Sequence, residues 1–204
     1  MEENKTEENK TETQSNTIAF FMDANILNAH MLAYSKDTAR ISMFKAINFR
    51  CKDKALHIAT TDGRMLLHTI LTGREMAQLP DFNRTFLLDR SIKCGKRGGA
   101  IVTIKGDVMR IDATGCNIPQ LFPEQDADVP YPNYFQCEIE EGDRIEPKVY
   151  KNFNSEILVK VSKYIPENKG ITYDSARYPD GVRMRIDVDD DVVKIATFMP
   201  LRTV

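Results

Sequence analysis

The sequence predicts an α+β fold, with antiparallel sheets on one side and a layer of helices on the other. Three observations predict it: the strand patterns are short, polar turns separate them, and there is one helix pattern for every four strand patterns. The elements follow the order strand, helix, three strands, and this order occurs three times in the 204 residues. Each helix must bury its apolar face, so it is expected to cover one face of a sheet.

The first unit follows a polar tail. Residues 1–16 contain the repeat EENKTEENKTE and cannot bury enough apolar surface to offset the entropy lost on ordering, so we expect them to be disordered. Residues 17–23 are the expected first strand, and Asp23 is the expected N-cap of a helix. The apolar face of that helix comprises Ile26, Leu27, Met31 and Tyr34. The next three strands are expected at 41–51, 55–61 and 64–71.

The second unit opens with an expected strand at 84–88. Asp89 is expected to cap a short helix at 90–97, which Gly98 ends. The three strands that follow are expected at 100–104, 108–112 and 116–122.

Residues 123–143 are rich in Pro, Asp and Glu and are interpreted as a connector. The third unit comprises residues 144–204. It starts with an expected strand at 144–153 and a helix capped by Asn154 or Ser155. The apolar face of this helix comprises Ile157, Leu158, Val161, Tyr164 and Ile165. Its strands are expected at 170–174, 181–189 and 192–202.

Composition restricts the classes of function. The net charge is −2 and the pI is near 6.0, so any attraction to nucleic acid must come from a local patch. The four cysteines form no CxxC pair, which favours reduced thiols in the cytoplasm over a zinc site or a disulfide framework. The longest apolar runs are too short to span a bilayer and no secretory pattern opens the sequence, so we expect a cytoplasmic protein without a membrane partner.

The sequence contains no pattern of catalytic residues. The histidines His30, His57 and His68 lie in apolar-patterned elements and outside any HExxH or GxSxG motif. No GxxxxGK[ST] or GxGxxG loop is present, and the acidic run at 187–191 lacks the EF-hand spacing of a calcium loop. We therefore expect no catalytic residue, no cofactor and no metal site, in a protein that is not an enzyme.

Basic residues recur on two of the predicted helices. Lys160 and Lys163 lie opposite the apolar face of the third-unit helix, and the second-unit helix repeats the arrangement. Two interpretations stay open: a solvated helix face, or a surface for the phosphates of double-stranded DNA without sequence specificity. The residues assigned to DNA binding under the second interpretation are Lys93, Lys96, Arg97, Lys160 and Lys163.

A hairpin corner stands between the strands expected at 55–61 and 64–71. Asp62-Gly63 between two such strand patterns is a strong hairpin signal. A turn needs only these two residues, so the threonine, arginine and methionine around them leave a second interpretation open, namely a binding surface.

Three stretches of the sequence resemble the bacterial sliding clamp, the beta subunit of the replicative DNA polymerase. ALHIATTDGRMLLHTI resembles a strand and corner of its middle domain, YPNY at 131–134 is similar to its FPDY motif, and MPLR at 199–202 is similar to its MPMRL motif. The resemblance covers residues 17–204. It implies helices on the inner wall of a ring and sheets outside, with 17–122 as a middle domain and 144–204 as the second half of a third domain.

In that family the three motifs together form a hydrophobic pocket that binds short linear peptides of polymerases and repair proteins. The resemblance therefore implies a peptide pocket in this chain as well. Its residues would be Thr61, Gly63, Arg64, Met65, Leu66, Pro132, Met199, Pro200, Leu201 and Arg202. The family's His-Arg pair at the corner is replaced by Arg64-Met65.

The resemblance implies a processivity factor for DNA replication that acts as a homo-oligomer and tethers DNA polymerase or repair proteins through short linear motifs. The alternative is a peptide-binding scaffold, or a competitor of a clamp, that does not encircle DNA. Salt-dependent association with DNA distinguishes these two functions.

Overall fold

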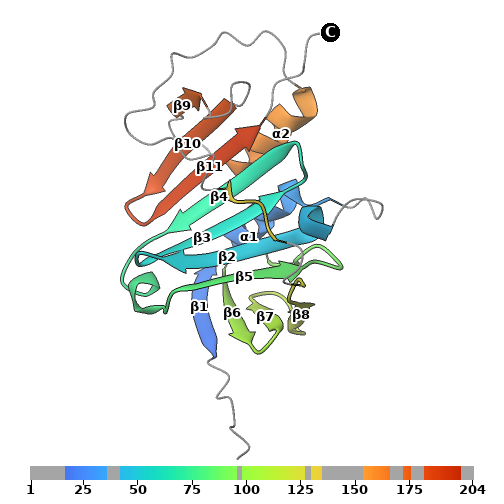
Figure 1. The fold of residues 1–204 in the computed structure, drawn as a ribbon, viewed down its shortest axis with the longest axis vertical. Helices are drawn as coiled ribbons and strands as arrows, with labels where there is room; N and C mark the ends of the chain where they lie inside the picture. Colours follow the sequence, from blue (N-terminus) through green and yellow to red (C-terminus); the bar gives the residue numbers. More distant parts are fainter. Residues whose placement is uncertain are drawn as a thin grey trace, which may run out of the picture.

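The computed structural model describes residues 17–35, 42–95, 98–126, 130–134, 154–165, 172–175 and 182–198. In this part of the chain the strands form two antiparallel sheets, accompanied by few helices (Figure 1). The predicted α+β class is therefore confirmed. The polar tail at 1–16 and the strand expected at 144–153 lie outside the described residues.

The larger sheet has seven strands in the order β5-β2-β3-β4-β11-β10-β9. They are β2 (Ala46–Lys52), β3 (Ala55–Thr61), β4 (Met65–Leu71), β5 (Phe82–Leu87), β9 (Thr172–Ser175), β10 (Val182–Asp189) and β11 (Val192–Phe198). Strand β3 has the predicted bounds. Strand β2 starts later than predicted, because residues Ser42–Lys45 form a 3₁₀ turn.

The smaller sheet has four strands in the order β1-β6-β7-β8. They are β1 (Ile18–Asp23), β6 (Gly99–Lys105), β7 (Val108–Ala113) and β8 (Gln120–Pro123). Strand β1 pairs with β6 of the second unit, and β5 pairs with β2 of the first unit. The strands of the first two units follow the predicted order along the chain, but the two units exchange their first strands.

The main core lies between the two sheets. Alternate residues of β2, among them Ile47 and Phe49, point toward the smaller sheet and are fully buried. Phe20, Val102 and Ile111 of the smaller sheet belong to the same apolar cluster. In β6, β7 and β8 of the smaller sheet, buried and outward side chains alternate, which is the period-two pattern of a sheet with one covered face.

Two helices cover the rest of the inner face of the larger sheet. They are α1 (Ala24–His30), which a 3₁₀ turn at Met31–Ala33 extends, and α2 (Ser155–Tyr164). The Asp23 carboxylate accepts a hydrogen bond from the Asn25 N–H at 2.8 Å, and the Asn154 side chain accepts one from the Glu156 N–H at 2.9 Å. The predicted cap at Asp23 is therefore present, and of the two candidates for the cap of α2, Asn154 and Ser155, the structure has Asn154.

The two helices share a second apolar cluster with β4, β10 and β11. Ile157, Val161 and Tyr164 of α2 are buried there, beside Ala29 and Ala33 of the α1 region. The predicted layer of helices thus consists of α1 and α2 in the described part of the chain.

The prediction of a helix at 90–97 is wrong for the described residues 91–95. Residues 91–95 have no regular secondary structure, and 96–97 lie outside the described residues. The Lys93 N–H donates to Gln120 Oε1 at 2.8 Å, Gln120 Nε2 donates to the Lys93 carbonyl, and the Gly95 N–H donates to the Thr114 carbonyl at 3.1 Å. Backbone groups that a helix would pair internally are therefore used by another part of the chain.

The third unit continues the sheet of the first unit. Strands β4 and β11 pair antiparallel over seven residues, from Met65 opposite Phe198 to Leu71 opposite Val192. The apolar stripe of α2 and one edge of β11 therefore have partners within the chain. The division into a domain at 17–122, a connector and a half domain at 144–204 stays a prediction.

Candidate functional site

The corner between β3 and β4 is held by its own polar side chains. The Thr61 hydroxyl accepts a hydrogen bond from the Gly63 N–H at 3.1 Å and donates to the Met65 carbonyl at 2.9 Å. Asp62 Oδ1 accepts from the N–H groups of Arg64 and Met65, both at 2.9 Å. Threonine and aspartate next to the glycine therefore fix the backbone shape of the turn, which a loop of glycine and other small residues would not do.

Gly63 is required at this corner for two reasons. Its φ of 82° lies in the left-handed region, which L-residues with side chains rarely adopt. A Cβ atom at this position would also lie 2.8 Å from Cζ of the Phe44 ring. The glycine thus lets the ring of Phe44 pack against the turn.

Replacing Gly63 with alanine is expected to lower the free energy of unfolding by about 2 kcal/mol, because the strained φ and the contact with Phe44 both act against it. Gly106→Ala is the matched control. Gly106 also has a positive φ, of 59°, but a Cβ atom added there would have no atom within 4 Å. We expect Gly106→Ala to lower the free energy of unfolding by about 1 kcal/mol. Equal losses in urea denaturation would contradict a role for the Phe44 contact.

The end of β11 lies at this corner. Phe198 is paired with Met65, and Thr197 is paired with Leu66. Phe198 and Met65 are buried, with 2% and 1% of their surface exposed, and both belong to the core cluster that α2 covers. Met65 therefore supports the corner from inside, whereas Leu66 points to the other face of the sheet. The predicted pocket residues Met199, Pro200, Leu201 and Arg202 lie outside the described residues.

The segment 130–134 lies against the face of the larger sheet opposite α1 and α2 (Figure 1). The Tyr134 hydroxyl donates to Asn48 Oδ1 at 3.1 Å, and its ring lies 4.8 Å from the ring of His68. His68 is two residues beyond Leu66 on β4 and projects from the same face as Leu66. Pro132, predicted to belong to the pocket, is exposed between the two tyrosines of this segment.

Two imidazoles lie on the same face of the sheet as this segment. His57 Nδ1 and His68 Nε2 are 3.0 Å apart, so one ring nitrogen donates a hydrogen bond to the other. Burial, with a further contribution from Arg50, lowers the pKa of His57 to about 4. Burial and neighbouring positive charge lower the pKa of His68 well below its ordinary value. Both rings are therefore neutral at pH 7.

The two predicted DNA-binding lysines of α2 have different surroundings. Lys160 Nζ is 3.3 Å from Asp62 Oδ2 and 3.5 Å from Glu156 Oε1. Lys163 is exposed and has no ion pair within the described part of the chain. Lys93 is also exposed, but it lies on the irregular segment 91–95 instead of a helix. Lys96 and Arg97 are outside the described residues.

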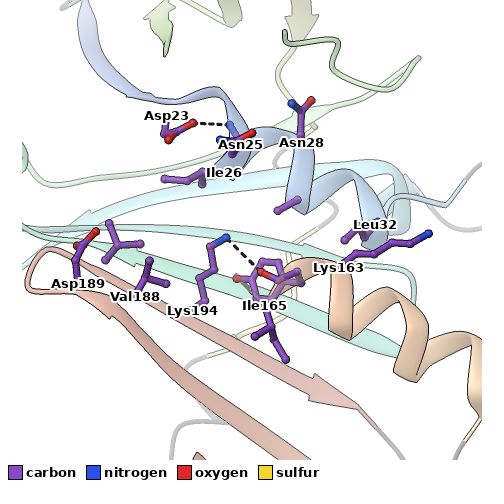
Figure 2. Close-up of a pocket in the computed structure, with 13 residues that line it drawn as sticks. Asp23, Asn25, Ile26, Asn28, Leu32, Lys163, Ile165, Val188, Asp189 and Lys194 are labelled. Atoms are coloured by element: carbon purple, nitrogen blue, oxygen red, sulfur yellow. Dashed lines mark hydrogen bonds between the residues drawn. The ribbon is translucent and has the colours of Figure 1, made fainter. Parts of the chain in front are cut away.

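A pocket of about 620 Å³ lies between α1, the end of α2 and the hairpin of β10 and β11 (Figure 2). Lys163 and Leu32 lie on one side of this pocket, and Asp23 and Asp189 lie on the other side (Figure 2). Lys194, which is 8% exposed, extends into the space between them. The mixed lining of acidic, basic and apolar groups does not select one class of ligand for this pocket.

A buried polar chain connects this pocket to the sheet. Lys194 Nζ donates to the Tyr164 carbonyl at 3.3 Å and lies 5.0 Å from the centre of the Tyr164 ring. The Tyr164 hydroxyl is 2.8 Å from Thr69 Oγ1, which is 2.9 Å from His30 Nε2. His30 Nδ1 in turn is 2.9 Å from the Thr60 hydroxyl. Both ring nitrogens of His30 are therefore hydrogen-bonded in a fully buried site.

The described residues contain no group of three or more His, Cys, Asp or Glu side chains arranged to hold a metal ion. No helix in the described ranges is long and apolar enough to cross a membrane.

The fold matches that of known sliding clamps. The DnaN sliding clamp (DNA polymerase III subunit beta) from Pseudomonas aeruginosa, in its complex with griselimycin, superposes with a TM-score of 0.60 at 13% sequence identity, and the match covers 91% of this chain and 66% of that clamp. The DNA polymerase sliding clamp from Bacillus subtilis gives a TM-score of 0.58 at 11% identity, over 94% of this chain and 66% of that one.

PCNA from A. fulgidus, in a structure with the C-terminal region of FEN-1 bound, gives a TM-score of 0.59 at 7% identity, over 91% of this chain and 99% of that one. No protein-family model and no curated protein matches the sequence. This chain therefore has a sliding-clamp fold and spans just under two thirds of the length of the bacterial clamps it matches.

Proposed function

We propose that this chain is a clamp-like processivity factor that associates with double-stranded DNA without sequence specificity and has no catalytic activity of its own. It tethers DNA polymerase or repair proteins through short linear motifs bound at the corner between β3 and β4. It acts as a homo-oligomer in the cytoplasm. The clamp fold supports the proposal.

The pairing of Phe198 with Met65 is the main observation in support of peptide binding at the corner. It brings the chain that precedes Met199 to the corner, and segment 130–134 contacts β4 near the same corner through His68. The corner, segment 130–134 and β11 are far apart in the sequence, and all three lie on or beside β4. PCNA from A. fulgidus has the C-terminal region of a second protein bound in its solved structure, which supports a tethering role for the fold.

A titration with a labelled hydrophobic clamp-binding peptide tests the proposal. Saturable binding to the wild-type chain, measured by fluorescence anisotropy, is the expected result. A scrambled peptide of the same composition is the control, because it separates a defined pocket from general apolar adhesion. The mass of the assembly in solution tests the oligomer, and a strictly monomeric species at tens of micromolar would contradict it.

Binding to a DNA duplex is expected to weaken steeply as salt rises, because each neutralised phosphate releases counterions. Removing Lys160 and Lys163 together is expected to flatten the plot of log affinity against log salt by up to about two units, one for each lost phosphate contact. Replacing the exposed Lys105 instead provides a control for general loss of charge. A slope equal to that of the wild type would show that the two lysines only solvate α2.

A peptide-binding scaffold that does not encircle DNA is the second candidate. The specific observation in its favour is that Lys160 is already paired with Asp62 and Glu156, so it is not an unpaired cation available to a phosphate. The irregular segment at 91–95 also leaves the second unit without its predicted basic helix in the described residues. Peptide binding together with salt-independent or absent DNA association would select the scaffold.

A further inference from the structure

One ion pair joins the helix face to the hairpin corner. Lys160 on α2 and Asp62 at the corner are 98 residues apart in the sequence, and Lys160 Nζ donates to Asp62 Oδ2 at 3.3 Å. The side chain of Asp62 is 13% exposed and that of Lys160 is 29% exposed. The pair is thus largely shielded from water on the carboxylate side and accessible from the lysine side.

The two oxygens of Asp62 serve two different structures. Oδ1 accepts the N–H groups of Arg64 and Met65 and so holds the turn. Oδ2 accepts the ammonium of α2. Because both oxygens belong to one rigid carboxylate, the position of Lys160 is transmitted to the backbone of the corner. Departure of Lys160 would remove a cationic contact from a carboxylate that is only 13% exposed and that also holds the turn.

We propose that Lys160 is a positioning residue that couples the two faces of the chain negatively, so that a DNA phosphate bound to Lys160 weakens peptide binding at the corner. This inference rests on the proposed function. The lysine has two mutually exclusive arrangements, paired with Asp62 or turned toward a phosphate on the outer side of α2. The peptide favours the first and DNA favours the second.

The coupling must be reciprocal. If DNA lowers the affinity for the peptide by some factor, the peptide lowers the affinity for DNA by the same factor. Lys163 provides the internal comparison, since it lies one turn further along α2, is exposed, and has no ion pair in the described residues. DNA can bind Lys163 without disturbing the corner.

The test measures peptide affinity with and without a short DNA duplex at constant ionic strength. In the wild type, saturating duplex is expected to weaken peptide binding about three- to tenfold. Lys160→Met is expected to weaken peptide binding by a similar factor without DNA, and the duplex should then have no further effect. Asp62→Asn should abolish the effect of the duplex on the peptide, since it removes the charge that Lys160 pairs with and keeps an oxygen for the turn.

Two further variants separate positioning from a general loss of charge. Lys163→Met is expected to retain the full effect of the duplex on the peptide, although it removes one charge from the same helix. Lys160→Arg is expected to restore both the peptide affinity and its response to DNA, because it keeps the cation next to Asp62.

The possible outcomes distinguish failure of the coupling from failure of the proposed function. If peptide and duplex both bind the wild type but do not affect each other, the coupling is overturned and the proposed function stands. If the duplex weakens peptide binding equally in the wild type and in Lys160→Met, the two ligands compete directly and the coupling is again overturned. If the wild type binds no peptide, the proposed function fails and the coupling fails with it.

Discussion

Deletion of residues 199–204 is expected to abolish binding of a hydrophobic clamp-binding peptide and to leave the fold in place. Strand β11 ends at Phe198, which is buried and paired with Met65, so the deletion leaves every described strand complete. Met199 and Leu201 follow directly and would supply flexible apolar surface for a partner side chain. Because buried anchor residues carry most of the energy of such interfaces, loss of their pocket should remove measurable binding.

Single substitutions test the contribution of individual residues of this segment to peptide binding. Met199→Ala and Leu201→Ala are each expected to weaken peptide binding by about 1–3 kcal/mol. Deletion of only Thr203 and Val204, which lie outside the resemblance to the clamp motif, is the matched control and should have little effect. Circular dichroism reports whether each variant is folded. Equal peptide affinity in the wild type and the six-residue deletion would show that the corner is only a hairpin.

Local sequence patterns predict the elements whose structure depends on their own residues. The alternating pattern of β3 and the Asp-Gly turn after it determine that strand, and its predicted bounds are confirmed. The helix cap at Asp23 is also predicted correctly, and the cap of α2 is one of its two predicted candidates, because a cap is an interaction between residues two positions apart.

The errors concern partners that lie far away in the sequence. Residues 91–95 have a composition compatible with a short helix, yet the side chain of Gln120 binds both the N–H and the carbonyl of Lys93. The exchange of β1 and β5 between the sheets is not predictable for the same reason: alternation shows which face of a strand is buried, but not which strand it pairs with.

In the candidate site, too, local features can be predicted from the sequence and contacts between distant residues cannot. The polar residues of the corner are recognisable from the sequence, but Met65, predicted to line the pocket, has its side chain in the core. The ion pair of Lys160 with Asp62 spans 98 residues and leaves no local signal. The apolar helix pattern around His30 indicates a structural residue, and its buried hydrogen bonds with Thr60 and Thr69 agree with this interpretation.

The protein is expected to lose several kcal/mol of unfolding free energy between pH 7 and pH 5. Burial, with the nearby charge of Lys194 adding to it, lowers the pKa of His30 to about 3. Burial also lowers the pKa of His57 to about 4 and places the pKa of His68 well below its ordinary value. In the unfolded chain each of these imidazoles titrates near pH 6.5. The folded state therefore binds fewer protons than the unfolded state throughout this range.

The sign of the effect follows from proton linkage. Stability falls as pH falls wherever the unfolded state binds more protons. The histidine contribution is complete above pH 6.5 and is lost progressively as pH falls toward 4 for His57 and toward 3 for His30. At pH 5, His30 and His57 each account for a loss of about 2 kcal/mol, or about 4 kcal/mol for the two together, and His68 adds a loss of the same sign. This is a large part of the 5–15 kcal/mol typical of a folded domain.

Urea denaturation at pH 5, 6, 7 and 8 measures this loss, and NMR titration of the imidazole signals measures its cause. The signals of the folded protein are expected not to shift between pH 7 and pH 5. His57→Gln is the most informative variant, because His57 is the least buried of the three and the substitution removes one titrating group. The slope of unfolding free energy against pH should then fall by about one proton equivalent. An unchanged slope, or imidazole signals that titrate near pH 6.5 in the folded protein, would show that these histidines are open to water and do not form the neutral, buried pairs that join β3, β4 and α1.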